Sequence, residues 1–238
     1  MYDLSKFRIN MYADGANLES IRELRSNPLV KGFTTNPTLM RMAGIDDYLA
    51  FAKEVVKLSN PLPVSLEVFA DEYLEMKKQA LFLAELGPNV YIKIPITNTK
   101  GQSSLSLINE LASLGVNINV TAVFTIEQVA GILSGLNPKA NIIISIFAGR
   151  IADTGLDPKP TIAESLKLAS GYPQVKILWA SPREIYNLIE AEKSGCHIIT
   201  MTPDLWKKIS NLGKDLNQFS LETVNMFFND AVASGYKL

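Results

Sequence analysis

The stretch Asn141-Ile-Ile-Ile-Ser-Ile-Phe147 is almost continuously apolar and rich in β-branched side chains. Continuous rather than alternating apolarity is typical of strands that are buried on both faces, as they are in parallel sheets. Similar short runs, bounded by turn residues, occur at Ile9–Ala13, Val30–Thr34, Pro63–Val68, Val90–Pro95, Val116–Thr121, Val175–Ala180 and Cys196–Thr200. We therefore predict eight buried strands, of which residues 141–147 form the sixth.

Segments with helical periodicity separate these strands. Residues 46–58 place apolar side chains at spacings of three and four. Further helices are predicted over Asp71–Leu86, Thr99–Leu114, Thr125–Leu136, Pro160–Ser170, Pro182–Ser194 and Pro203–Leu212. Eight strand–helix units predict an α/β protein with the (β/α)8 TIM-barrel fold. A doubly wound open sheet is the alternative, but it usually has five or six strands.

The chain shows no linker-like stretch rich in Pro, Gly or Ser, so we expect residues 1–238 to form a single domain. Residues 220–238 are predicted to form one additional C-terminal helix beyond the eighth unit. This helix carries apolar side chains that need a partner surface, either on the parent barrel or on a neighbouring subunit. They are Leu221, Val224, Phe227, Phe228 and Val232.

Charge and cysteine content exclude several classes of function. The chain has 23 Lys and Arg against 24 Asp and Glu, and a net charge of −1 gives no basic surface for nucleic acid or an acidic membrane. One cysteine, Cys196, and one histidine, His197, exclude a disulfide framework and a Cys- or His-rich metal site. Cys196 and His197 are neighbours on a predicted strand and face opposite ways, so they do not easily form a catalytic pair. We expect Cys196 to be a core residue. We find no signal peptide or membrane-spanning run, and we predict a cytoplasmic location.

Active sites of (β/α)8 barrels lie at the C-terminal ends of the strands, and the fourth predicted strand carries Lys93 near that end. Lysine is almost never fully buried without a partner. Desolvation lowers the pKa of buried lysines in general, and a neutral amine can form a Schiff base with a carbonyl. The residues alone leave a second interpretation equally open, in which Lys93 extends to the strand end or pairs with a carboxylate.

Other strand ends offer two carboxylates, Asp14 and Glu67, and two arginines, Arg150 and Arg183. Schiff-base chemistry needs an acid/base for its proton transfers, and paired guanidinium groups suit a phosphate monoester. Taken singly, each carboxylate fits a structural ion pair or cap better, and each arginine fits a surface salt bridge better.

Five segments at separate strand ends carry a family resemblance. They are Phe33-Thr-Thr-Asn-Pro37, Tyr91-Ile-Lys-Ile-Pro95, Asn119-Val-Thr121, Phe147-Ala-Gly-Arg-Ile-Ala-Asp153 and Ala180-Ser-Pro-Arg183. In this order they resemble transaldolases, in particular the short branch that also contains fructose-6-phosphate aldolases. The resemblance covers nearly the whole chain and implies a (β/α)8 barrel with a Schiff-base lysine on the fourth strand.

The resemblance implies four catalytic residues. Lys93 would attack the carbonyl at C2 of a ketose. Glu67 would act through a water as general acid/base, and Thr121 would help to hold that water. Asp14 would take the proton of the substrate hydroxyl during carbon–carbon cleavage. The residues implied to bind the phosphorylated sugar are Asn36, Asn119, Ser145, Phe147, Arg150, Ser181 and Arg183. No metal and no cofactor is implied, because the iminium itself accepts the electrons.

Two positions favour a transaldolase over an aldolase. The aldolase branch has Gln where this chain has Glu67, and Tyr where it has Phe147, and phenylalanine cannot hydrogen-bond a water. The implied reaction belongs to the pentose phosphate pathway: sedoheptulose 7-phosphate and glyceraldehyde 3-phosphate give erythrose 4-phosphate and fructose 6-phosphate. A fructose-6-phosphate aldolase, a sulfo-sugar transaldolase and a non-enzymatic phosphosugar-binding barrel are the alternatives.

Two departures from the pattern support keeping these alternatives. Residues 13–17 read Ala-Asp-Gly-Ala-Asn where better-known members have a hydroxyl residue after the aspartate, and Pro182 stands where an aromatic residue is usual. The C-terminal helix resembles one that short-branch members use across subunits, which implies a homo-oligomer.

Overall fold

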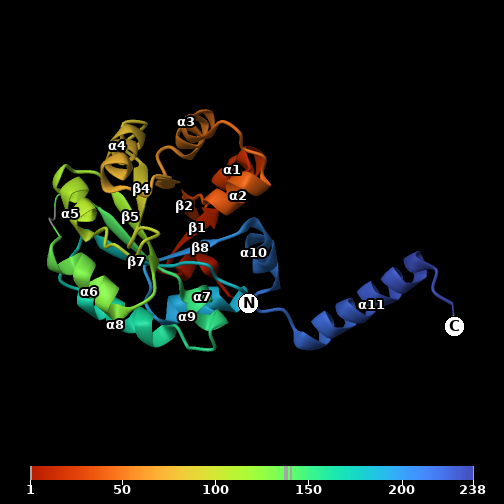
Figure 1. The fold of residues 1–238 in the computed structure, drawn as a ribbon. Helices are drawn as coiled ribbons and strands as arrows, with labels where there is room; N and C mark the ends of the chain where they lie inside the picture. Colours follow the sequence, from red (N-terminus) through yellow and green to blue (C-terminus); the bar gives the residue numbers. More distant parts are fainter. Residues whose placement is uncertain (1, 137–138, 140, 238) are drawn as a thin grey trace.

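The structure is a computed structural model that describes residues 2–136, 139 and 141–237. In this part of the chain, eight parallel strands close into a barrel in sequence order (Figure 1). The strands are β1 (Asn10–Asp14), β2 (Val30–Thr34), β3 (Val64–Glu67), β4 (Val90–Pro95), β5 (Ile118–Val123), β6 (Ile142–Ile146), β7 (Val175–Trp179) and β8 (Ile198–Met201). The predicted (β/α)8 barrel is confirmed.

Helices surround the barrel and follow the strands in turn (Figure 1). They are α1 (Leu18–Arg25), α2 (Pro37–Met42), α3 (Tyr48–Ser59), α4 (Tyr73–Ala84), α5 (Leu105–Ser113), α6 (Ile126–Ser134), α7 (Ala148–Asp153), α8 (Lys159–Ala169), α9 (Tyr186–Lys193) and α10 (Pro203–Lys208). Short 3-10 turns occupy Leu4–Lys6 and Ile209–Asn211. This ring of helices covers the outer face of the strands, which explains why the strands are apolar on both faces.

Helices α1, α2 and α7 were not among the predicted segments. Helices α1 and α2 are short and bury one residue each, Ile21 in α1 and Met40 in α2. Their starts are set by side-chain caps instead: Asn17 accepts a hydrogen bond from Ser20 N, and Asn36 accepts one from Leu39 N.

Helix α5 begins at Leu105 rather than at Thr99, where the sequence predicted it. Residues 97–103 form a turn closed by an antiparallel bridge between Thr97 and Ser103. Inside this turn the side chain of Asn98 accepts hydrogen bonds from the backbone N–H groups of Lys100 and Gln102. These local side-chain bonds give the backbone of residues 98–102 an alternative to the helix.

The lower half of the barrel interior is filled by apolar side chains. Tyr12, Ile143, Leu178, Ala180 and Ile198 form a buried cluster inside the strands. The ring of Tyr12 lies over Gly32, where an added Cβ would approach the ring to 2.5 Å. This cluster fills the barrel interior beneath the polar groups at the C-terminal ends of the strands.

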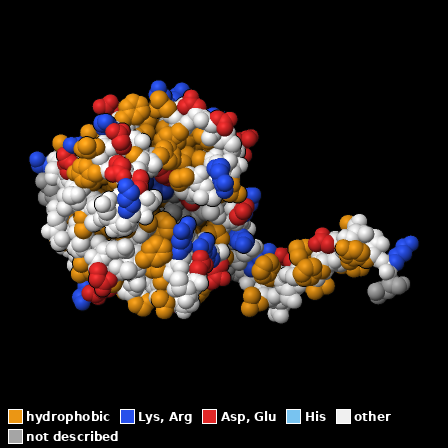
Figure 2. Space-filling view, viewed as in Figure 1, with side chains coloured by type: hydrophobic (Ala, Val, Ile, Leu, Met, Phe, Trp, Pro, Cys, Tyr) orange, Lys and Arg blue, Asp and Glu red, His pale blue; other side chains and the backbone are white. Residues whose placement is uncertain are grey.

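Helix α11 (Leu216–Ser234) projects away from the barrel (Figure 1). None of its residues, all of which the structure describes, is buried. The predicted additional helix is thus present but begins four residues earlier than residue 220, because Asp215 caps it by accepting a hydrogen bond from Gln218 N. Figure 2 shows apolar side chains along its length, and Phe227 and Phe228 are 63% and 67% exposed. The parent barrel is therefore not the partner surface.

In the described ranges, no helix combines the length and apolarity needed to cross a membrane.

Candidate active site

A cavity of about 490 Å³ opens at the C-terminal end of the barrel. All of the residues that the sequence and the family resemblance proposed for the site line it: Asp14, Asn36, Glu67, Lys93, Asn119, Thr121, Ser145, Phe147, Arg150, Ser181 and Arg183. They come from strands and loops that are far apart in the sequence. The structure therefore brings the predicted residues together, while the role of each remains a prediction.

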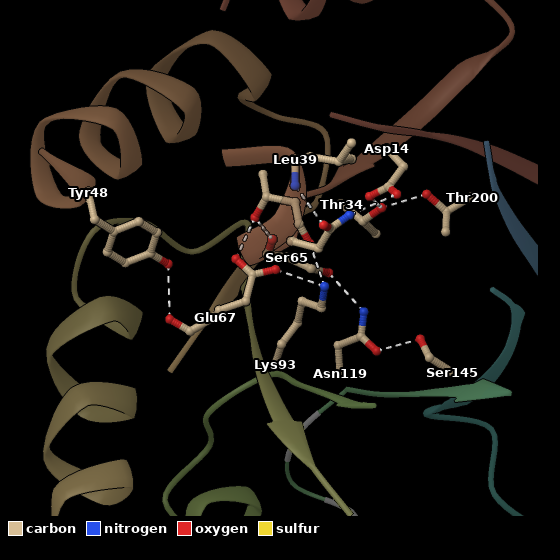
Figure 3. Close-up of polar contacts among 12 residues, drawn as sticks. Asp14, Thr34, Leu39, Tyr48, Ser65, Glu67, Lys93, Asn119, Ser145 and Thr200 are labelled. Carbon is tan, nitrogen blue, oxygen red and sulfur yellow. Dashed lines mark hydrogen bonds and ion pairs between the residues drawn. The ribbon is translucent and has the colours of Figure 1, made fainter. Parts of the chain in front are cut away.

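Lys93 and Glu67 form a buried ion pair at the floor of this cavity (Figure 3). The two residues are register partners on neighbouring strands β4 and β3, which explains their contact. Lys93 Nζ lies 2.8 Å from Glu67 Oε1, and their side chains are only 14% and 6% exposed. Nζ also donates a hydrogen bond to the carbonyl of Thr35. The lysine is thus paired with a carboxylate and still faces the cavity.

Asp14 accepts two hydrogen bonds at the end of β1. Its Oδ1 receives one from Thr34 Oγ1 at 2.8 Å, and its Oδ2 receives one from Asn36 Nδ2 at 3.2 Å. Thr34 Oγ1 lies 2.5 Å from Thr200 Oγ1 (Figure 3). Burial raises the pKa of Asp14 above its ordinary value, although the charge of Lys93 and the hydrogen bond from Thr34 partly offset this effect. A carboxyl group tuned in this way can exchange a proton with a molecule in the cavity.

Asn119 on β5 is held between two hydroxyl groups, Ser65 on β3 and Ser145 on β6. Its Nδ2 donates to Ser65 Oγ at 3.0 Å, and its Oδ1 accepts from Ser145 Oγ at 2.7 Å. These bonds fix the orientation of a buried amide next to Lys93 (Figure 3). Thr121 follows Asn119 at a spacing of two and therefore lies on the same face of β5.

Sequence reasoning missed three polar residues of this region. Ser65 and Thr34 complete the hydrogen-bond networks just described, and Tyr48 donates from its hydroxyl to the backbone oxygen of Glu67 at 3.0 Å. The spacing of two between Ser65 and Glu67 is a signal that could have found Ser65, because strand residues at that spacing share a face. Tyr48 lies on α3, and no local pattern connects a helix residue to a strand end.

Arg150 and Arg183 lie at the rim of the cavity in different environments. The Arg150 guanidinium lies over the Phe147 ring, 5.4 Å from its centroid, and among the described residues no carboxylate pairs with it. Arg183 makes two hydrogen bonds to Asp153, from Nε to Oδ1 at 3.1 Å and from Nη2 to Oδ2. The rim therefore offers one guanidinium without a carboxylate partner and one that already has an anionic partner.

Gly149 allows the two arginine-bearing segments to meet. Its N–H donates to the carbonyl of Ala180 at 3.2 Å, and a Cβ at this position would come within 1.6 Å of the Ser181 carbonyl oxygen. Ser181 itself has a positive φ of 56°. Only a glycine fits this approach, and it fixes the relative position of the segments that carry Arg150 and Arg183.

Cys196 and His197 lie away from this cavity, just before β8. The Cys196 side chain is buried, as predicted for a core residue, and burial raises the pKa of its thiol to about 12. His197 Nδ1 accepts a hydrogen bond from Ile177 N at 2.9 Å. Among the described residues there is no group of three or more His, Cys, Asp or Glu side chains arranged to hold a metal ion.

Comparisons with solved structures agree with the barrel. Dihydrodipicolinate synthase from Rhodopseudomonas palustris matches with a TM-score of 0.57 and 15% identity, over 81% of this chain and 69% of that chain. An HpcH/HpaI aldolase/citrate lyase family protein from Burkholderia cenocepacia matches with a TM-score of 0.58 and 12% identity, over 92% and 95%. At these identities the likeness shows the fold alone.

Comparisons of the sequence define the family. The model of the Transaldolase/Fructose-6-phosphate aldolase family matches residues 11–237. A Methanococcus maripaludis protein named "Probable transaldolase" is 34% identical over 85% of this chain and 90% of its own length. A Brucella anthropi protein of the same name is 33% identical over 97% of this chain and all of its own length. The chain therefore belongs to the transaldolase/fructose-6-phosphate aldolase family and is an enzyme of that family.

Proposed function

We propose that the protein is a transaldolase that moves a dihydroxyacetone unit from a ketose phosphate to an aldose phosphate through a Schiff base on Lys93. The donor would be sedoheptulose 7-phosphate or fructose 6-phosphate. The observation that carries the proposal is the contact of 2.8 Å between Lys93 and Glu67 at the floor of the cavity, with Asp14 beside it and two arginines at the rim.

The first step is attack of the Lys93 amine on C2 of the ketose. The amine must give up a proton to become a nucleophile, and Glu67 Oε1 is a positioned acceptor for it. The carbinolamine then loses its hydroxyl group as water, and protonated Glu67 supplies the proton for that departure through a water that Thr121 helps to hold. The product is an iminium ion, which can accept an electron pair.

In the second step Asp14 takes the proton of the C4 hydroxyl. The C3–C4 bond breaks, its electrons neutralise the iminium as an enamine, and the shortened aldose leaves. The raised pKa of Asp14 suits a base that must later return this proton to the oxygen of the acceptor aldehyde. Attack of the enamine on that aldehyde forms the new bond, and hydrolysis of the iminium frees Lys93.

Phe147 supports transfer to an aldehyde over transfer to water. Its ring packs 5.8 Å from the ring of Phe124 and lies beneath the guanidinium of Arg150. An aromatic hydrocarbon at this place neither donates nor accepts a hydrogen bond, so it cannot orient a water for early hydrolysis of the enamine. The enamine then persists until an acceptor binds.

A coupled assay with fructose 6-phosphate and erythrose 4-phosphate tests the transferase activity. An acceptor-free control measures release of dihydroxyacetone, and release as fast as transfer would identify an aldolase instead. Borohydride added with the ketose should trap a covalent adduct on Lys93. Lys93→Met is the control, and an adduct of equal yield in that variant would refute the role of Lys93.

Arg150 and Arg183 are proposed to bind the phosphate of the sugar, because guanidinium groups match phosphate in a bidentate manner. Arg183→Ala should mainly raise KM for phosphorylated ketoses. An equal rise with an unphosphorylated ketose would argue against this role. A lower KM for a sulfonated ketose than for the phosphate would favour the sulfo-sugar transaldolase.

We also propose that residues 1–238 form one domain that associates through α11 into a homo-oligomer. A helix with this much exposed apolar surface needs a partner, and a second copy of the chain is the simplest source of one. A cytoplasmic location stays a prediction of the sequence.

A further inference from the structure

Thr35 lies between the two charged groups of the proposed mechanism. Its backbone carbonyl accepts a hydrogen bond from Lys93 Nζ, and its hydroxyl lies 2.8 Å from Glu67 Oε2. The same hydroxyl lies 2.9 Å from the backbone oxygen of Ser65. Thr35 is 0% exposed, so it can act on the reaction only through the residues that it contacts.

The Thr35 hydroxyl has one proton but two oxygen neighbours. The Ser65 carbonyl can only accept a hydrogen bond, whereas a carboxyl group accepts when it is ionised and can donate when it is protonated. When Glu67 is ionised, the Thr35 proton points to Oε2. When Glu67 takes a proton from Lys93 on Oε1, Oε2 becomes the carbonyl oxygen of the acid and still accepts from Thr35. The Ser65 carbonyl keeps a partner in both cases, because Thr35 N also donates to it at 3.3 Å.

We infer that Thr35 is a positioning residue whose hydroxyl holds Glu67 in place in both of its protonation states, by donating to Oε2 while Oε1 exchanges the proton with Lys93. The inference rests on the proposed Schiff-base function, in which Glu67 takes up and returns a proton in each turnover. The hydroxyl holds the carboxylate oxygen that does not exchange the proton, so the carboxylate need not turn. Oε1 therefore stays next to Lys93 throughout the cycle.

Thr35→Val tests the inference, because it removes the hydroxyl and keeps the branched shape. We expect kcat to fall about tenfold or more, the factor that corresponds to one hydrogen bond to a charged group, while KM stays within about twofold. The acid limb of the pH–rate profile should move to higher pH, because the ionised carboxyl loses a donor. Thr35→Ser keeps a hydroxyl and should restore both the rate and the profile.

The charged and titratable groups that face Glu67 in the described structure are Lys93 on β4, Asp14 on β1 and Tyr48 on α3, and they are unchanged in all variants. Ser165→Ala is the matched control. It removes a fully buried hydroxyl that donates to the Thr161 carbonyl within α8, and it should leave kcat and the pH profile unchanged.

Two results would overturn the inference: wild-type kcat and pH profile in Thr35→Val, or a Thr35→Ser variant as slow as Thr35→Val. If Thr35→Val does not fold, Thr35→Cys takes its place, because a thiol is only a weak donor and acceptor. The same slower turnover and shifted profile are then expected, and wild-type behaviour overturns the inference.

Borohydride trapping separates the two proposals. Absence of an adduct in the wild-type enzyme refutes the Schiff-base function. An adduct in the wild-type enzyme together with unaffected kinetics in Thr35→Val refutes only the role of Thr35.

Discussion

Breaking the Lys93–Glu67 ion pair should destabilise the protein far more than breaking an exposed pair of the same length. In Lys93→Met, the 6%-exposed Glu67 loses the cation 2.8 Å from its Oε1 and keeps the hydroxyl of Thr35 as its neighbour. Removing one partner of a buried pair typically costs about 3–5 kcal/mol, because the remaining charge is uncompensated. For a chain of this size, about 2–4 °C is lost per kcal/mol, so the Tm should fall by roughly 6–20 °C.

Thermal unfolding followed by circular dichroism, at one protein concentration and neutral pH, measures this difference. Lys100→Met is the matched control: Lys100 lies 2.7 Å from Glu72, but the two side chains are 62% and 65% exposed, and no measurable change in Tm is expected. The double variant Lys93→Met/Glu67→Gln should melt above Lys93→Met, because it removes the uncompensated charge. A Tm for Lys93→Met within about 2 °C of wild type, or a double variant that melts no higher than Lys93→Met, would refute the reasoning.

Three further results are expected. Folding raises the pKa of Asp14, so the folded chain binds this proton more tightly than the unfolded chain, and the ionised carboxyl opposes folding above its folded-state pKa. Asp14→Asn should therefore raise the Tm near pH 7. A difference in Tm from wild type that does not change with pH down to about pH 4 would contradict this. Gly149→Ala places a Cβ against the Ser181 carbonyl. It should lower the free energy of unfolding in urea by at least about 1–3 kcal/mol and raise KM for phosphorylated ketoses. Wild-type values for both would show that the rim of the cavity tolerates a side chain at this position. Replacing Phe227 and Phe228 by Asp should lower the molar mass measured by light scattering without lowering helix content, and an unchanged mass would argue against association through α11.

Much of the fold was predictable because its signals are local. Each predicted strand overlaps an observed one, since short continuous apolar runs bounded by turn residues are typical of buried parallel strands. The errors occur where local signals are weak or compete. Helices α1 and α2 bury one residue each, and the Asn98 turn delays the start of α5.

The candidate site was predictable to the level of residue type and strand end. The fold places the C-terminal ends of all strands around one opening, so polar residues at those ends, such as Lys93 and Arg150, converge there. The contacts of Thr35 and Tyr48 with Glu67 were not predictable. Both depend on how far one element is shifted along the next, which no single segment encodes.

The sequence by itself determined the barrel, the lysine on its fourth strand and the family motifs at the strand ends. It also showed that the C-terminal helix needs an apolar partner, because its side chains alone establish that requirement. Only the tertiary structure decided that this partner is not the parent barrel, and that Lys93 pairs with Glu67 while Asp14 sits in a setting that raises its pKa. The reason is physical: burial and pairing of charges depend on strand register and barrel closure, which arise from the packing of the whole chain.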